Sequence, residues 1–181
     1  TSVSDKVVSS AAAALEGVEN GMSLSVGGFG VCGAPFTTLR TLSEQNIKDL
    51  TIYSNNPGMQ DVQGVSHGIA ALVAKKQVAK FAGSFIGFNK AFEKEFLTGG
   101  VEVELIPQGT LAERMRAGGA GIPAFYTPTG VGSAVADGGL PLRYDANSEV
   151  AKTSEPKETR DFKVRGEERT YVLEHSINTD F

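Results

Sequence analysis

Four short apolar segments that alternate with helix-like segments constrain the fold of this chain most strongly. The apolar segments, residues 22–26, 50–53, 78–82 and 101–106, have the length and composition of β-strands. Residues 36–46, 69–76, 90–97 and 110–118 carry the apolar spacing or end signals of helices. This alternation indicates βαβ units. We predict an α/β fold with a parallel sheet and helices on both of its faces.

Unusual loops follow all four predicted strands, beginning at Gly27, Asn55, Gly83 and Pro107. Because crossovers between parallel strands are right-handed, such loops share the carboxyl edge of the sheet. We expect the four loops to meet there in one crevice.

The rest of the chain gives weaker signals. Residues 5–16 predict a first helix, and residues 161–164 and 169–173 predict a β-hairpin. The glycine- and proline-rich segment 118–144 is expected to be irregular, and the polar segment 147–159 is expected to be a surface loop. We expect residues 1–181 to form a single domain that is truncated at its C-terminus.

Charge and composition exclude several classes of protein. A net charge of −4 gives no footprint for nucleic acid, and no apolar run reaches the length of a membrane span. Cys32 is the single cysteine, so an intrachain disulfide is impossible. His67 and His175 have no Cys or carboxylate at ligand spacing, so we expect no metal site.

The glycine-rich segment after the first strand has the strongest local pattern. Gly27 and Gly28 let backbone N–H groups approach an anionic or carbonyl oxygen closely, and Pro35 suits the first turn of the next helix. A purely structural turn is an equally simple interpretation. Residues 28–33 also match G-x-G-x-x-G, but residues 53–56 (Tyr-Ser-Asn-Asn) replace the acidic residue of a dinucleotide site.

Residues 20–35 resemble the signature of the α half of family I CoA-transferases: Asn-Gly, a strand, Gly-Gly-Phe, then Gly and Pro. Ser25 departs from the usual apolar triplet before Gly27. Similar blocks at residues 54–58, 102–114 and 116–127 extend the resemblance over essentially the whole chain.

The resemblance implies transfer of CoA from succinyl-CoA to a 3-oxoacid such as acetoacetate, through a glutamyl-CoA thioester. It places the nucleophilic glutamate in a β half, in a Ser-Glu-Asn-Gly-like motif that this chain lacks. We therefore expect no catalytic residue here and no turnover by this chain alone. Glu113 is interpreted as the capping-box partner of Thr110, and Glu102 and Glu104 as outward strand positions.

The resemblance also assigns site residues. Gly27, Gly28 and Phe29 would line the acyl site, whereas Asn55, Asn56, Asn89 and Gln108 would supply neutral amides near the reacting centre. Phe88 replaces a residue that is Glu in the family pattern Gly-Glu-Asn, which puts a polar role at that position in doubt. Loop capping is the alternative role for each amide.

The same resemblance predicts the partners. The protein partner is a β-type half, either a separate subunit or a C-terminal part of the same polypeptide. The substrates are an acyl-CoA and a carboxylic acid. The assembly is expected to be a homo- or hetero-oligomer. No cofactor is expected, because coenzyme A is a substrate. The expected location is the mitochondrial matrix for a eukaryotic source and the cytoplasm for a bacterial one. Acetate as the acceptor, a non-catalytic CoA- or nucleotide-binding module, and a glycine-rich domain without a ligand are the alternatives.

Overall fold

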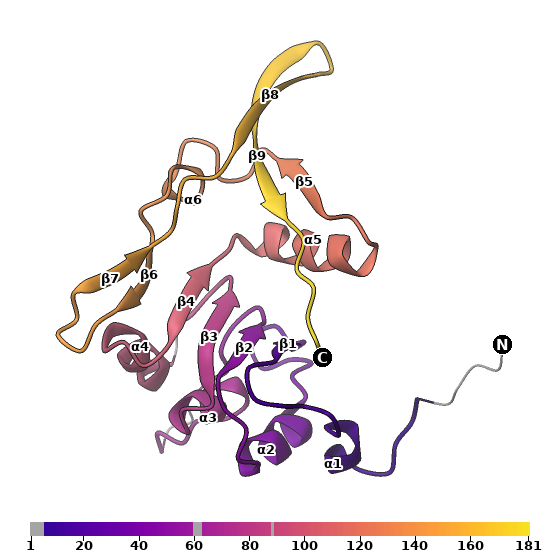
Figure 1. Cartoon of the computed structure of the whole chain (residues 1–181), viewed down its shortest axis with the longest axis vertical. Coiled ribbons are helices and arrows are strands. Elements are labelled where there is room, and N and C mark those ends of the chain that lie inside the picture. Colours follow the sequence, from indigo (N-terminus) through magenta and orange to yellow (C-terminus); the bar gives the residue numbers. More distant parts are fainter. Residues whose placement is uncertain (1–5, 60–62, 88) are drawn as a thin grey trace.

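The main sheet of the protein is parallel, as predicted (Figure 1). The computed structural model describes residues 6–59, 63–87 and 89–181. Four strands lie in the order β1-β2-β3-β4, and their bounds are Ser23–Ser25, Leu50–Tyr53, Val78–Gly83 and Glu102–Leu105. Helices α2, α3, α4 and α5 follow them in turn, with bounds Phe36–Glu44, Ile69–Ala74, Lys90–Leu97 and Gln108–Gly119.

Helices lie on both faces of the sheet, but unequally. The strands are added in chain order, and right-handed crossovers then place α2, α3 and α4 on one face. On the opposite face, α5 packs through Leu111 and Met115 against Tyr53 and Ala82. Most of the apolar core therefore lies on the α2–α4 face.

Alternation along the strands explains which face is apolar. Ile52, Phe81 and Val103 are fully buried in the cluster with the helices. The rings of Phe81 and Phe92 of α4 meet edge to face, with centroids 5.3 Å apart. Truncation of a fully buried ring such as Phe81 costs about 3–5 kcal/mol, so this contact anchors α4 beneath the carboxyl edge of β3.

The segment predicted to be irregular contains regular structure instead. Residues 118–144 include β5 (Ala124–Thr127), α6 (Ala134–Asp137) and β6 (Pro141–Tyr144). The predicted surface loop 147–159 likewise contains β7 (Val150–Thr153), which pairs with β6. Both predictions were wrong because the short strands are defined by their pairing partners rather than by local periodicity.

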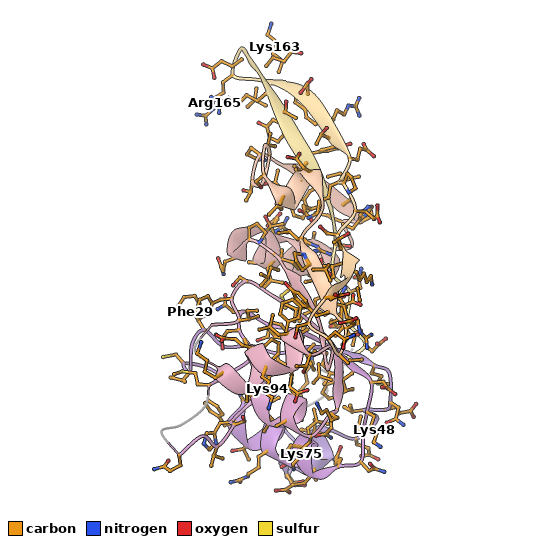
Figure 2. All side chains as sticks on the ribbon, turned by 90° about the vertical axis from the view of Figure 1, so that its left-hand side faces the viewer. Phe29, Lys48, Lys75, Lys94, Lys163 and Arg165 are labelled. Atoms are coloured by element: carbon orange, nitrogen blue, oxygen red, sulfur yellow. The ribbon has the colours of Figure 1, made fainter. Side chains whose placement is uncertain are left out.

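The predicted C-terminal hairpin is confirmed and belongs to a larger sheet. Strands β8 (Thr159–Val164) and β9 (Glu167–His175) are antiparallel, and β5 pairs with the other side of β9. The turn holds Arg165 and Gly166, both with positive φ, in place of the longer turn expected at residues 165–168. This hairpin projects away from the main sheet (Figure 1), with Lys163 and Arg165 at its tip (Figure 2).

The first helix is shorter than predicted. Helix α1 spans only Ala11–Ala14, and the side chain of Ser10 caps it by accepting a hydrogen bond from the N–H of Ala13 at 3.1 Å. Residue 5 of the predicted helix lies outside the described residues. Serines compete with helical backbone bonds and favour caps, which explains the late start.

The end of the chain lies against the edge strand β1. The N–H of Phe181 donates to the carbonyl of Ser23 at 3.1 Å, and the N–H of Ser25 donates to the carbonyl of Phe181 at 3.0 Å. These two bonds flank Leu24 and form the pattern of a parallel ladder. The hydroxyl of Ser25 also lies 3.1 Å from that of Thr179, which gives this polar strand residue a local partner.

Candidate active site

The four loops that follow the strands leave the sheet at one edge, as predicted. Hydrogen bonds connect the neighbouring strand ends: Val26 N–H to the Tyr53 carbonyl at 2.9 Å, Ser54 N–H to the Ala82 carbonyl at 3.1 Å, and Ile106 N–H to the Gly83 carbonyl at 2.9 Å. Each bond joins the end of one strand to the next. The glycine loop, the asparagine loop and the segments after β3 and β4 thus start side by side.

The glycine loop exposes two backbone donors. Gly28 has φ 128°, and a Cβ built there would lie 3.2 Å from the Cα and Cβ of Ala34, so the position requires glycine. The N–H groups of Gly27 and Gly28 make no hydrogen bond with any residue that the structure describes. Unpaired N–H groups at the carboxyl edge of a sheet are suited to bind an oxyanion.

Beyond these donors the loop folds back on itself. The backbone groups of Phe29 and Cys32 exchange two hydrogen bonds of 2.9 and 3.1 Å around Gly30, whose φ is 62°. This turn leaves the Phe29 side chain 71% exposed and projecting from the body of the molecule (Figure 2). The structure therefore places Phe29 at the surface of the edge rather than in a closed acyl pocket.

The side-chain oxygens of the two asparagines in the second loop both accept hydrogen bonds. Asn55 Oδ1 accepts from the Ser84 hydroxyl at 2.7 Å, and Asn56 Oδ1 accepts from the N–H of Gly58 at 3.1 Å. Asn56 therefore caps its own loop, whereas Asn55 links the second loop to the segment after β3. The Nδ2 groups of both asparagines, in contrast, donate to no described residue and keep their capacity to bind a ligand oxygen.

Asn56 lies beside the glycine loop. Gly27, Gly28 and Asn56 line one narrow cavity of about 10 Å³, together with Ser54 and Ala34. Such a volume barely admits a water molecule. The glycine amides and Asn56 are thus brought together in a tightly packed edge.

Asn89 and Gln108 occupy different environments. Asn89 is fully buried and caps α4, accepting a hydrogen bond from the N–H of Phe92 at 3.0 Å, and its Nδ2 group has no partner among the described residues. Gln108 is the first residue of α5 and is exposed. Asn89 is therefore primarily a helix cap, whereas Gln108 remains available at the edge. Phe88 lies outside the described residues.

The predicted capping box at Thr110 is wrong. Helix α5 begins at Gln108 after Pro107, and the Thr110 hydroxyl is buried without a hydrogen-bond partner in the described part of the chain. Glu113 instead pairs with Arg116 one turn later, at 2.7 Å. Proline has no N–H to cap and fixes φ for a helix start, so the helix begins earlier than the side-chain pattern suggested.

A charge network that the sequence analysis missed connects β3, β4 and α5. Glu104 of β4 accepts from Lys80 of β3 at 2.7 Å and from Arg114 of α5 at 3.0 Å. Burial alone would raise the pKa of Glu104, but these two cations outweigh it and lower the pKa. The signal was present in the alternation of residues 102–105, which places Glu102 and Glu104 on the less apolar face.

The network continues into the C-terminal sheet. Glu174 of β9 is 2% exposed and pairs with Lys157 at 2.5 Å, and Arg114 Nε lies 3.9 Å from its second oxygen. Arg114 therefore sits between two carboxylates on different sheets. Both carboxylates are ion-paired and are therefore poor candidates for a nucleophile.

A second, larger cavity lies between α2 and α3. Its volume is about 760 Å³, and none of the seven predicted site residues lines it. It shares Phe36 and Gly68 with the narrow cavity beside the glycine loop. The sequence pattern did not predict this cavity, because the cavity depends on the spacing between two helices.

The described residues contain neither a membrane-spanning helix nor a metal-binding cluster. Within these ranges no helix is both long and apolar enough to span a bilayer. The same ranges hold no group of three or more His, Cys, Asp or Glu side chains that could hold a metal ion.

Comparisons with known proteins identify the family. The family model described as coenzyme A transferase matches residues 8–181. Over 177 residues the chain is 52% identical to one subunit of a probable succinyl-CoA:3-ketoacid coenzyme A transferase from Mycobacterium bovis, covering 98% of this chain and 68% of the relative. It is 46% identical over 168 residues to the Mus musculus succinyl-CoA:3-ketoacid coenzyme A transferase 2A, mitochondrial, covering 93% of this chain and 31% of the relative.

A solved structure supports the fold. The acyl-CoA transferase YdiF from E. coli O157:H7, described as a thioester complex with CoA, superposes with a TM-score of 0.65 at 20% identity, over 94% of this chain and 32% of that protein. The family signature at residues 20–35, the loops gathered at one sheet edge and the sequence matches agree with one another. The chain belongs to the coenzyme A transferase family.

Proposed function

We propose that this chain is the α-type half of an enzyme that moves CoA from succinyl-CoA to a 3-oxoacid such as acetoacetate. The observation that carries the proposal is the carboxyl edge of the sheet. There Gly27 and Gly28, whose N–H groups have no hydrogen-bond partner among the described residues, line one narrow cavity together with Asn56. The names of the similar mycobacterial and mouse proteins support the choice of substrates.

The proposed transfer proceeds through a carboxylate nucleophile. The carboxylate attacks the thioester carbonyl of succinyl-CoA, and the CoA thiolate leaves as a mixed anhydride forms. The thiolate then attacks the enzyme carbonyl of the anhydride, which releases succinate and leaves a glutamyl-CoA thioester. The acceptor carboxylate repeats these steps in reverse and departs as its CoA thioester. Such a covalent intermediate divides one difficult transfer into easier steps.

This chain supplies donors rather than the nucleophile. Each attack creates a negative oxygen, which the amides of Gly27 and Gly28 and the Nδ2 groups of Asn55 and Asn56 would stabilise. The loops 27–35, 54–58, 83–89 and 107–109 contain no Asp or Glu. The glutamate must then come from another chain segment, which we assign to a β-type half.

The sizes of the relatives agree with this division. The chain spans about two thirds of the mycobacterial relative, whose name describes one subunit of an enzyme, and about one third of the mouse relative. We propose a complete enzyme that joins this half to a β half, either as two subunits or as one longer polypeptide. Its compartment would follow its source, with the mitochondrial matrix for a eukaryotic protein and the cytoplasm for a bacterial one.

Intact mass spectrometry of the complete enzyme tests the proposal. After incubation with succinyl-CoA, we expect the β half to gain a CoA thioester and this chain to keep its mass. If the two halves are one polypeptide, peptide mapping assigns the adduct to one half. Addition of acetoacetate should discharge the thioester, and addition of acetate in a parallel sample shows whether it is also an acceptor. A CoA adduct on this 181-residue chain, or no adduct on any chain, would contradict the proposal.

A further inference from the structure

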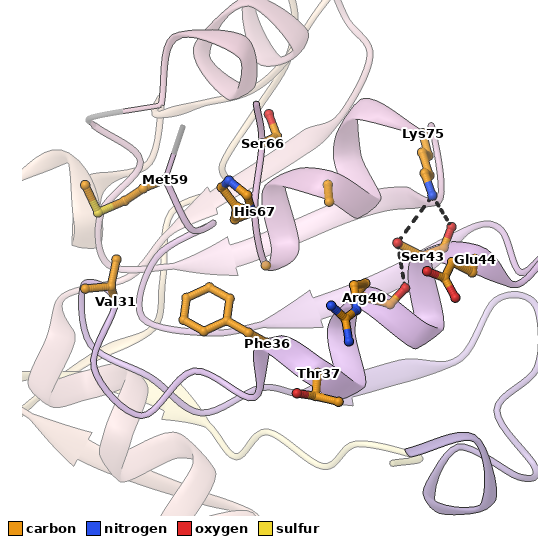
Figure 3. Close-up of a pocket in the computed structure, with 12 residues that line it drawn as sticks. Val31, Phe36, Thr37, Arg40, Ser43, Glu44, Met59, Ser66, His67 and Lys75 are labelled. Atoms are coloured by element: carbon orange, nitrogen blue, oxygen red, sulfur yellow. Dashed lines mark hydrogen bonds between the residues drawn. The ribbon is translucent and has the colours of Figure 1, made fainter. Parts of the chain in front are cut away.

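The cavity between α2 and α3 has the size of a small-molecule site. Its volume is about 760 Å³, within the range of roughly 300–1,000 Å³ that is usual for such sites. Phe36, Arg40 and Glu44 line one side from successive turns of α2, and Gly68, Ala71 and Lys75 line the other along α3 (Figure 3).

Small residues on α3 explain why the cavity exists. Leu39 and Leu42 of α2 point into the core, so Phe36 and Arg40 occupy a different face of that helix. Opposite them, Gly68 has no side chain and Ala71 contributes only a methyl group. A Cβ at Gly68 would lie 3.4 Å from the Phe36 ring, which shows how closely the α3 backbone approaches there.

One end of the cavity is apolar and incompletely covered. Val31 of the glycine loop, Phe36 of α2 and Met59 after β2 line this end (Figure 3). Their side chains are 51%, 41% and 37% exposed, although they face a common hollow. An apolar group bound between them would remove this surface from water at a gain of about 25 cal/mol per Å².

The other end carries two cations. The Arg40 guanidinium makes no hydrogen bond or ion pair with the described residues. Lys75 Nζ donates to the Ser43 carbonyl at 2.7 Å and to its hydroxyl at 3.3 Å, which leaves a third N–H group without an acceptor among the described residues. Glu44 is the one acidic side chain among the described lining residues, so Arg40 and Lys75 leave this end with excess positive charge.

We propose that this cavity binds a small organic anion. The carboxylate or phosphate group of the ligand lies on Arg40 and Lys75, and its apolar body extends toward Phe36, Val31 and Met59. The guanidinium fork of arginine matches either head group. The cavity takes Val31 from the glycine loop but none of the seven predicted site residues, so binding there does not depend on the proposed function.

Isothermal titration calorimetry on the 181-residue chain tests the ligand class. The probes are hexyl phosphate, hexanoate, hexanol and inorganic phosphate, at low salt. At least one six-carbon anion should bind with one-to-one stoichiometry, and more tightly than hexanol or inorganic phosphate. The tighter of the two anions identifies the head group. Absence of saturable binding by both six-carbon anions, or hexanol binding as tightly as they do, overturns the proposal.

Two matched variants test the position of the ligand. Arg40→Gln, at an exposed position, should weaken binding of the six-carbon anion about tenfold or more. Lys94→Gln removes one positive charge from α4, outside the cavity, and should leave the affinity unchanged. Circular dichroism and urea unfolding confirm that both variants are folded. Equal loss of affinity in both variants would show nonspecific attraction to charge and would refute the site.

Discussion

Arg114 donates a hydrogen bond from Nη1 to Glu104 Oε1 at 3.0 Å, and from Nε to the backbone carbonyl of His175 at 2.7 Å. Glu104 belongs to the last strand of the main sheet, Arg114 to α5 and His175 to the end of the C-terminal hairpin. One side chain therefore connects three parts of the fold. The N-terminus of the same α5 carries Gln108 at the candidate active site.

Loss of the Glu104 carboxylate should destabilise the protein. Glu104→Gln removes the charged partner of both Lys80 and Arg114 and should lower the free energy of unfolding by about 1–3 kcal/mol. Urea unfolding followed by circular dichroism measures the change. Glu113→Gln is the matched control, because its pair with Arg116 is at the surface and should matter much less. Equal effects of the two substitutions would contradict a special role for Glu104.

The effect of Glu104→Gln should depend on pH. The pKa of Glu104 is lowered in the folded protein, since Lys80 and Arg114 outweigh the opposing effect of burial. Its contribution is complete above the ordinary glutamate pKa of about 4.3 and is lost as the pH falls through the lower folded pKa. The difference in stability between wild type and Glu104→Gln should therefore be constant from about pH 5.5 to 8 and shrink below about pH 4.3. A difference that grows on acidification would reverse the assigned sign. Urea unfolding at a series of pH values gives this difference.

Substitution of Asn89 should separate its capping role from a role in the site. Asn89→Ala removes the acceptor for the N–H of Phe92 and should cost about 1 kcal/mol in unfolding free energy. Asn89→Ser keeps a capping oxygen and should recover most of that stability. If catalysis by the complete enzyme falls in Asn89→Ser while stability is retained, Asn89 acts in the site as well as in the cap.

Gly28→Ala should impair transfer in the complete enzyme. The new Cβ meets Ala34 at 3.2 Å in a backbone conformation with φ 128°, so the loop and its unpaired N–H groups must move. Displacement of such donors should lower kcat about 10- to 100-fold. Steady-state kinetics with succinyl-CoA and acetoacetate measure this change.

Gly139→Ala is the control for Gly28→Ala. Gly139 also has positive φ, 86°, but a Cβ there meets nothing within 4 Å and the residue lies far along the chain from the glycine loop. Gly139→Ala also places a side chain at a positive φ, whereas kcat should be unchanged. A similar loss of kcat in both variants would mean that general strain, not the geometry of the glycine loop, limits activity.

The sequence alone determined the parallel sheet and the position of the candidate site. Strands and helices of the main sheet follow from local periodicity, and the handedness of crossovers then places Gly27, Asn55 and Gln108 at one edge. Gly27 and Gly28 were singled out from the sequence because they let backbone N–H groups approach a ligand, whereas the φ of 128° at Gly28 is a finding of the structure. Such features depend on residues that are near one another in the chain.

Only the tertiary structure decided which strands pair with the short C-terminal strands and which groups contact the buried polar side chains. The pairing of β5 with β9 joins residues 124–127 to residues 172–175, and no local signal marks such a distant pair. The same holds for Arg114 between Glu104 and Glu174, for Asn89 as a buried cap, and for the cavity lined by Arg40 and Lys75. In each case the deciding energy comes from packing and charge contacts between elements far apart in the sequence, which local periodicity does not encode.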